Sequence, residues 1–199
     1  MSTSHVEPEW AMVTVLFVDI RGFTAFADRS TAREAVDYLN EFFALAVPTI
    51  AEHGGRVDKL LGDGLLAVFA ASDHADRALL AATNLLAAVG EHCRIGIGVN
   101  SGLVLMGTIG AGDVVEVGVI GDPVNVAARV QDATRELQEP LLVTEATHCL
   151  LEDEQIRLEP RGTLSLRGKP EPIAVYGVAP GSVTLPGRPP RRKELRWQL

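Results

Sequence analysis

The stretch Arg56–Phe69, RVDKLLGDGLLAVF, organises the rest of the chain, because it contains two short apolar runs joined at Gly62-Asp63-Gly64. An Asp-Gly pair between two such runs favours a β-hairpin. The runs are nearly continuous rather than alternating, which indicates strands covered on both faces. Lys59 and Asp63 lie in this apolar setting, and since an unpaired buried charge is costly we expect each to have a partner. The alternative is a tight surface turn with a salt-bridged lysine.

The composition indicates one globular domain that can bury a full core. The chain has 199 residues, of which 47% are hydrophobic, and a net charge of −8. This charge argues against binding nucleic acid through a general basic surface. Two cysteines, Cys93 and Cys149, give neither a disulfide framework nor a metal-ligand spacing. Residues 1–10 lack the features of a signal peptide and no apolar run has transmembrane length, so we expect a cytoplasmic protein without a membrane segment.

Apolar periodicity outside the hairpin predicts an α+β fold with helices over one sheet. The clearest helix is 31–53, with a capping box at Thr31 and Glu34. Its predicted buried face consists of apolar residues at helical spacing: Val36, Leu39, Phe43, Ala46, Val47 and Ile50. Further helices are predicted over 72–90, from Asp122 as N-cap, and over 144–151. Strands are predicted over 12–20, 94–100, 102–109, 141–143, 156–159, 163–167 and 173–178, with a Ser-Gly turn at 101–102 and a protruding arm over 110–119.

Two carboxylates stand at the ends of predicted buried strands. Asp19 ends the strand 12–20 and precedes the turn Arg21–Thr24, and Asp63 lies in the hairpin. Strand ends that open into loops often carry chemistry. Paired carboxylates there would form an oxygen site for Mg²⁺ or Mn²⁺, ions that bind together with substrate phosphates. The alternative for Asp19 is a cap on the next helix.

A second group of polar residues follows at the start of the helix after residue 121. Asn125 and Arg129 are four residues apart and so project from one helical face. They offer a donor and a cation for charge that develops in a transition state, and Lys59 adds a donor for a phosphate or a base nitrogen. The alternative is an exposed polar stripe. Together these residues predict a metal-dependent enzyme acting on a nucleoside triphosphate.

Three motifs in this order, LFVDIRGFT (16–24), KLLGDG (59–64) and GDPVNVAAR (121–129), resemble those of the class III nucleotidyl cyclase catalytic domain. The resemblance is closest to actinobacterial, mycobacterial-type, adenylyl cyclases. It implies a ferredoxin-like core with a central, mostly antiparallel sheet flanked by helices, in a head-to-tail homodimer with active sites at the interface. It divides the chain into a lead-in (1–10), a catalytic domain (11–179) and a Pro/Arg-rich tail (180–199).

The same resemblance implies that ATP is converted to 3′,5′-cyclic AMP and pyrophosphate, with two Mg²⁺ or Mn²⁺ ions in each active site. In one subunit Asp19, Asp63 and the backbone of Ile20 match metal-binding positions. Backbone N–H groups of the turn that includes Phe23 and Thr24 would hold phosphates. No separate general base is required, because the metals would lower the pKa of the ribose 3′-OH.

The partner subunit would complete the site. Lys59 matches the lysine that distinguishes adenine from guanine, since its ammonium is donor-only and adenine N1 is an acceptor. Asn125 matches the residue that orients the ribose, and Arg129 the one that stabilises the pentavalent phosphorus. Arg167 matches a cation for the terminal phosphates, with Lys169 as the alternative.

The sequence departs from the family pattern at Gly118, where adenylyl cyclases usually carry Asp or Thr to accept from the adenine amino group. Three alternatives remain open: a backbone group or a water molecule replaces the missing side-chain acceptor, the specificity is relaxed towards some use of GTP, or this position has been altered. We therefore expect Gly118→Asp to raise ATP turnover and ATP/GTP discrimination. Leu103 also replaces a phosphate-binding arginine of some relatives.

Other functions remain as alternatives. One is a degenerate cyclase domain that binds nucleotide and regulates a partner. A guanylyl cyclase would carry Glu in place of Lys59, and a diguanylate cyclase would contain a GGDEF-like string. A phosphotransfer receiver would lack both the hairpin and the Asn125/Arg129 helix.

Overall fold

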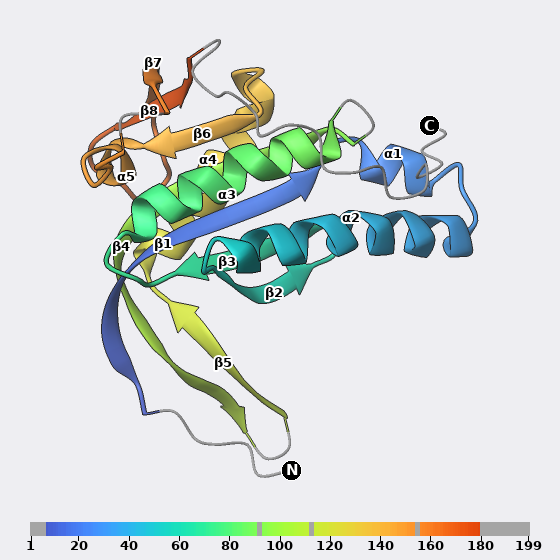
Figure 1. Ribbon diagram of the computed structural model, residues 1–199, viewed down its shortest axis with the longest axis horizontal. Coiled ribbons are helices and arrows are strands. Elements are labelled where there is room, and N and C mark those ends of the chain that lie inside the picture. Colours follow the sequence, from blue (N-terminus) through green and yellow to red (C-terminus); the bar gives the residue numbers. More distant parts are fainter. Residues whose placement is uncertain (1–6, 91–92, 112–113, 154–155, 180–199) are drawn as a thin grey trace.

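The computed structural model describes residues 7–90, 93–111, 114–153 and 156–179 (Figure 1). The predictions for the tail, and for residues 1–6 of the lead-in, lie outside the described residues.

The described chain folds around one eight-stranded sheet with the order β2-β3-β1-β4-β6-β8-β7, and β5 pairs with β4 outside this path. The β4–β6 pair is parallel and the other pairs are antiparallel, so the sheet is mostly antiparallel, as predicted. The strands are β1 (Glu9–Ile20), β2 (Arg56–Leu61), β3 (Gly64–Phe69), β4 (Ile95–Ala111), β5 (Val114–Ile120), β6 (Leu141–Thr144), β7 (Leu158–Leu164) and β8 (Ile173–Val178). The helices are α1 (Phe23–Ala27), α2 (Ala32–Glu52), α3 (His74–Val89), α4 (Asp122–Glu136) and α5 (Glu145–His148).

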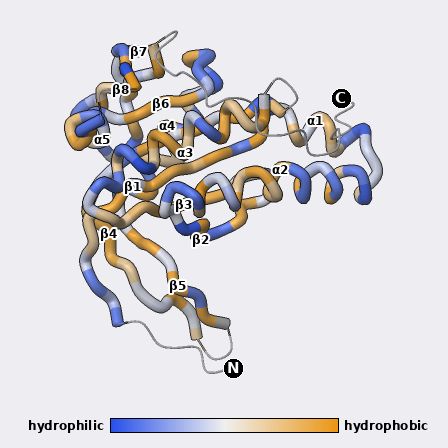
Figure 2. Tube along the Cα trace, in the orientation of Figure 1, coloured by the Kyte–Doolittle hydropathy of each residue, from blue (hydrophilic) through white to orange (hydrophobic). Residues whose placement is uncertain are grey.

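Helices cover both faces of the sheet, and β1 shows which side chains meet which helix. Leu16, Val18 and Ile20 of β1 are buried in the core formed with α2 and α3. Val13 and Val15 pack instead with Ala127 of α4. Because side chains alternate along a strand, Asp19 points to the α4 side. Figure 2 shows that the central strands β1 and β6 are largely hydrophobic.

The hairpin at residues 62–63 is confirmed, but only one of its strands is covered on both faces. Every residue of β3 is buried, whereas β2 forms the edge of the sheet. Leu60 and Leu61 of β2 are 55% and 45% exposed. The prediction that both strands are covered on both faces is therefore wrong for β2.

Helix α2 has the predicted capping box, in which Thr31 accepts from the Glu34 N–H and the Glu34 carboxylate accepts from the Thr31 N–H. Its buried residues are Phe42, Ala46 and Ile50. The prediction missed Phe42 and wrongly included Val36 and Val47, which are exposed. The reason is that the buried residues follow a line of four-residue steps, Phe42, Ala46 and Ile50. Val36 and Val47 lie to one side of this line.

The predicted turn at Ser101-Gly102 is wrong, because residues 95–111 form the single strand β4. β1 pairs with β4 from Glu9↔Met106 to Ile20↔Ile95 and so keeps it extended. The glycines serve close packing of α4: a Cβ on Gly98 would lie 2.2 Å from the Gln131 nitrogen, and one on Gly102 would lie 2.6 Å from Pro123 Cγ. Together these contacts set the position of α4 on the sheet.

Other predicted elements differ in detail. The protruding arm is present as the β4–β5 hairpin, which extends away from the body in Figure 1. The predicted strands 156–159 and 163–167 are one strand, β7, with an irregularity between Pro160 and Gly162. The N-cap of α4 is Gly121 rather than Asp122.

Candidate active site

The carboxylates of Asp19 and Asp63 are brought together where β1 and β3 meet. Asp19 pairs with Gly64 in the antiparallel register, and the Ile20 N–H donates to the Asp63 carbonyl oxygen at 3.3 Å. A Cβ on Gly64 would lie 2.4 Å from the Val18 carbonyl oxygen. Glycine therefore permits the close approach of the two strands beside the carboxylates.

The electrostatics of this pair fit a cation. Burial, followed by repulsion from Asp63, raises the pKa of Asp19 to about 6, against a weaker lowering effect of Arg135. Two carboxylates held this close are stabilised by a shared positive ion. No cluster of three or more His, Cys, Asp or Glu side chains suited to a metal occurs among the described residues. The remaining ligands of an ion would come from backbone, water or substrate phosphates.

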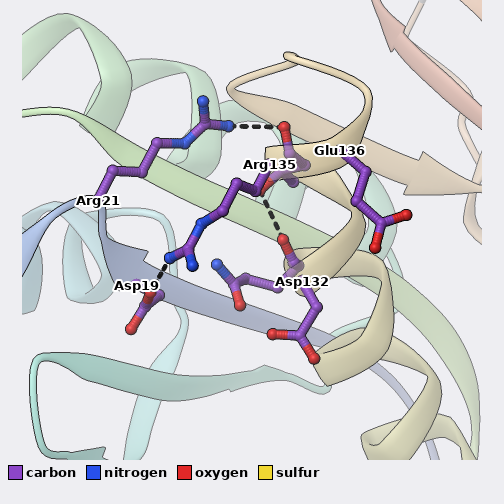
Figure 3. A pocket seen from close by; sticks show the side chains of 7 residues that line it. Asp19, Arg21, Asp132, Arg135 and Glu136 are labelled. Atoms are coloured by element: carbon purple, nitrogen blue, oxygen red, sulfur yellow. Dashed lines mark hydrogen bonds and ion pairs between the residues drawn. The ribbon is translucent and has the colours of Figure 1, made fainter.

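A pocket of about 220 Å³ opens beside Asp19 on the α4 side of the sheet (Figure 3). The Arg135 guanidinium points at Asp19 and lies 3.9 Å from its carboxylate oxygen. Arg21 donates to the carbonyl oxygens of Thr134 and Glu139 and so attaches β1 to the end of α4. The lining residues are Asp19, Arg21, Gln131, Asp132, Thr134, Arg135 and Glu136.

The predicted phosphate-binding turn offers fewer backbone N–H groups than expected. The Arg21 N–H already donates to the Arg94 carbonyl oxygen at 2.7 Å, so it is engaged within the fold. Gly22 has φ +79°, a left-handed conformation suited to glycine, and starts helix α1. The first N–H groups of a helix have no acceptor within it, which leaves those at Phe23 and Thr24 for phosphate. The Phe23 ring stacks on Tyr38 of α2 and anchors the turn.

Lys59 has the charged partners that the sequence analysis expected. Its ammonium donates to the Glu116 carboxylate of β5 and lies 3.5 Å from Asp58 Oδ2. The hydrogen bond to Glu116 is the main reason why the pKa of Lys59 is raised. A Cβ on Gly118 would lie 3.0 Å from Lys59 Nζ. The fold thus brings together Lys59 and Gly118, the two positions matched to purine recognition.

Asn125 and Arg129 lie on α4 next to the loop that contains Arg167. The Arg129 guanidinium donates to the Arg167 carbonyl oxygen. Lys169 instead forms an ion pair with Asp122 at the start of α4. Arg129 therefore contacts the backbone of residue 167, whereas the Lys169 ammonium is already paired with a carboxylate.

The predicted residues lie in separate groups: Asp19 beside Asp63, Lys59 beside Gly118, and Arg129 beside the loop of Arg167. The pocket beside Asp19 has neither Lys59, Asn125 nor Arg129 in its lining. Sequence reasoning also missed Arg135, six residues after Arg129 on the same helix, and Glu116, two residues before Gly118. Glu116 carried a usable signal, because alternate residues of a strand share a face.

The model of the adenylate and guanylate cyclase catalytic domain matches residues 6–179. A protein of Mycobacterium tuberculosis described as uncharacterized is 38% identical over 169 residues, which cover 81% of this chain and 30% of that protein. An adenylate cyclase of Anabaena cylindrica is 33% identical over 184 residues, covering 83% of this chain and 36% of that protein. The chain thus spans about a third of the length of these relatives.

Solved structures give the same match. The adenylyl cyclase CyaB of P. aeruginosa superposes with a TM-score of 0.78 at 25% identity, covering 87% of this chain and 96% of that chain. The guanylyl cyclase Cya2 superposes with a TM-score of 0.74 at 27% identity, covering 88% and 94%. Among the described residues, no helix has the length and apolar character needed to cross a bilayer.

Proposed function

Because the chain belongs to the adenylate and guanylate cyclase catalytic domain family, we propose that it is an adenylyl cyclase that converts ATP to cyclic AMP and pyrophosphate. The observation that carries this proposal is the Asp19–Asp63 carboxylate pair, together with Lys59 on the same hairpin. We assign the catalytic domain to residues 11–179, with 1–10 and 180–199 outside it.

Proteins of this family use divalent metal ions, generally Mg²⁺ or Mn²⁺. Two ions bound here would lower the pKa of the ribose 3′-OH and neutralise the pyrophosphate that leaves. Asp19 and Asp63, with the backbone of Ile20, would hold them. The N–H groups at Phe23 and Thr24 would bind phosphate oxygens, and burial beside the sheet would keep the carboxylates fixed in orientation.

A second protomer would contribute Lys59, Gly118, Asn125, Arg129 and Arg167. In this arrangement, a head-to-tail homodimer, both active sites are shared between the two protomers. Arg129 would donate to the equatorial oxygens of the α-phosphate as negative charge develops on them, and Asn125 would orient the ribose. Arg167 would hold the terminal phosphates.

The test is product formation by the purified chain. Cyclic AMP and cyclic GMP are measured after incubation with ATP or GTP, each with Mn²⁺ and with Mg²⁺. We expect cyclic AMP to be the main product, and none with the metals chelated. Nucleotide binding without either product would contradict the proposal and favour the regulatory, non-catalytic alternative.

One observation favours a second candidate, a cyclase of relaxed specificity. Gly118 has no side chain to accept from the adenine amino group. One missing hydrogen bond costs about 1–3 kcal/mol of discrimination. Comparable rates of cyclic AMP and cyclic GMP formation would support this candidate.

A further inference from the structure

We infer that Glu116 supplies the hydrogen-bond acceptor for the purine amino group that Gly118 has no side chain to provide, which makes Glu116 a specificity-determining residue. This inference rests on the proposed function, because it concerns the base-recognition half of the same site.

The position of Glu116 on β5 supports this role. Residues 116 and 118 are two apart on one strand and so face the same side. Gly118 lies opposite Gly107 of β4, and Glu116 lies opposite Ile109, two positions along the same ladder. A Cβ on Gly118 would be 3.0 Å from Lys59 Nζ, and the Glu116 carboxylate already accepts from that ammonium. Both positions therefore serve the same donor.

Two carboxylates flank Lys59, and their exposure separates their roles. The Asp58 side chain is 0% exposed, and its Oδ1 pairs with Arg56 at 2.8 Å. The Glu116 side chain is 57% exposed. A base that docks against Lys59 can reach Glu116 without displacing the fold, whereas Asp58 is covered. Asp58 therefore holds Lys59 in place, and Glu116 is the acceptor open to a ligand.

The pair matches the chemistry of adenine. The hydrogen-bonding edge of adenine presents an acceptor, N1, next to a donor, the amino group. Lys59 is donor-only, and a carboxylate is acceptor-only with two oxygens. One oxygen of Glu116 can hold Lys59 while the other accepts from the amino group. Guanine places N1–H against the donor Lys59, and it fits this pair only if it shifts so that O6 meets Lys59.

The experiment compares kcat/KM for ATP and for GTP in the wild type and in Glu116→Ala. We expect the ATP/GTP ratio to fall about tenfold, the effect of losing one hydrogen bond to a charged group. Glu116→Gln, which keeps a carbonyl acceptor, should retain most of the ratio. The matched control is Glu159→Ala: Glu159 is also on a strand, 53% exposed and ion-paired, with Arg161, but it lies on β7 at the opposite edge of the sheet.

Gly118→Asp provides the rescue. In the Glu116→Ala background it should restore the ratio, because Lys59 Nζ is the end of a flexible side chain and can yield to the new group. In the wild-type background it should change the ratio less than about twofold, since one carboxylate already accepts there. The family pattern by itself predicts that Gly118→Asp raises the ATP/GTP ratio of the wild type. This variant therefore distinguishes that expectation from a role of Glu116.

Each outcome is decisive for the inference. An unchanged ratio in Glu116→Ala, or a larger loss of GTP use than of ATP use, would overturn it. A wild type that makes no cyclic nucleotide would contradict the proposed function alone, because the same ratio can be measured from equilibrium binding of ATP and GTP by calorimetry. Circular dichroism of each variant checks folding. If Glu116→Ala does not fold, Glu116→Leu, which keeps the bulk of the side chain but has no acceptor, replaces it with the same expected fall in the ratio.

Discussion

Asp19→Asn should make the metal-free protein more stable while it removes activity. Burial and the neighbouring Asp63 raise the pKa of Asp19 from an ordinary value of 3.8 to about 6. The folded state therefore binds the proton more tightly than the unfolded state does. Below about pH 4 the carboxyl is protonated in both states, and the wild type and the variant should be equally stable. As the pH rises through about 6, the wild type loses stability relative to the neutral asparagine.

The magnitude follows from the two pKa values. Each pKa unit corresponds to about 1.4 kcal/mol, which sets an upper bound of about 3 kcal/mol. The Asp19 side chain is 31% exposed, so solvent screens part of the repulsion. We expect about 1–2 kcal/mol after that discount. For a domain of this size, this raises the melting temperature by about 3–6 °C at pH 7.5.

The assay is thermal unfolding of both proteins from pH 4 to pH 8, with and without Mn²⁺. The wild type should gain more stability from Mn²⁺ than the variant, because the carboxylate pair binds the ion. The control is Asp28→Asn, which changes an exposed aspartate of the same charge outside the pocket. An Asp19→Asn protein that is less stable than the wild type at pH 7.5 without metal would refute the reasoning.

Three further predictions concern the shared site and the elements that position it. Asp19→Ala and Arg129→Ala proteins should each be inactive, and an equal mixture should recover about a quarter of wild-type cyclase activity, since half of the dimers then hold one intact site; no recovery by folded, dimeric proteins would contradict a shared site. Gly98→Ala should destabilise the fold by about 1–3 kcal/mol in urea denaturation, because the new Cβ would meet the backbone of α4; an unchanged midpoint would argue against close packing there. Thr144→Val should cost about 1–3 kcal/mol, since it removes the donor to Asn100 Oδ1 at 2.7 Å in the buried network; Thr163→Val, at an exposed position of β7, is the control in the same denaturation series.

Local sequence signals were sufficient for several elements. The Asp-Gly hairpin, the capping box of α2 and the Thr144 N-cap of α5 depend on residues at most four positions apart. The placement of Asp19 beside Asp63 also needs the antiparallel pairing of β1 with β3, in which Asp19 lies opposite Gly64.

Glycine patterns showed the limit of this reasoning. The glycines near Ser101 suggested a turn, but β1 pairs along the whole of β4 and keeps it extended. Positions 98 and 102 need a residue without a side chain, because α4 packs against them. The identity of a glycine does not distinguish a turn from a close contact with another element, so the sequence alone could not separate the two.

Local sequence therefore specified most of the strands and helices and the chemical groups available to a cyclase, because propensity, capping and turn chemistry act over a few positions. Tertiary pairing was needed to bring Glu116 to Lys59, 57 residues apart, and Arg135 to Asp19. These contacts depend on the register of β5 on β4 and on how closely α4 approaches the sheet. Both are set by packing between distant elements, which no local pattern encodes.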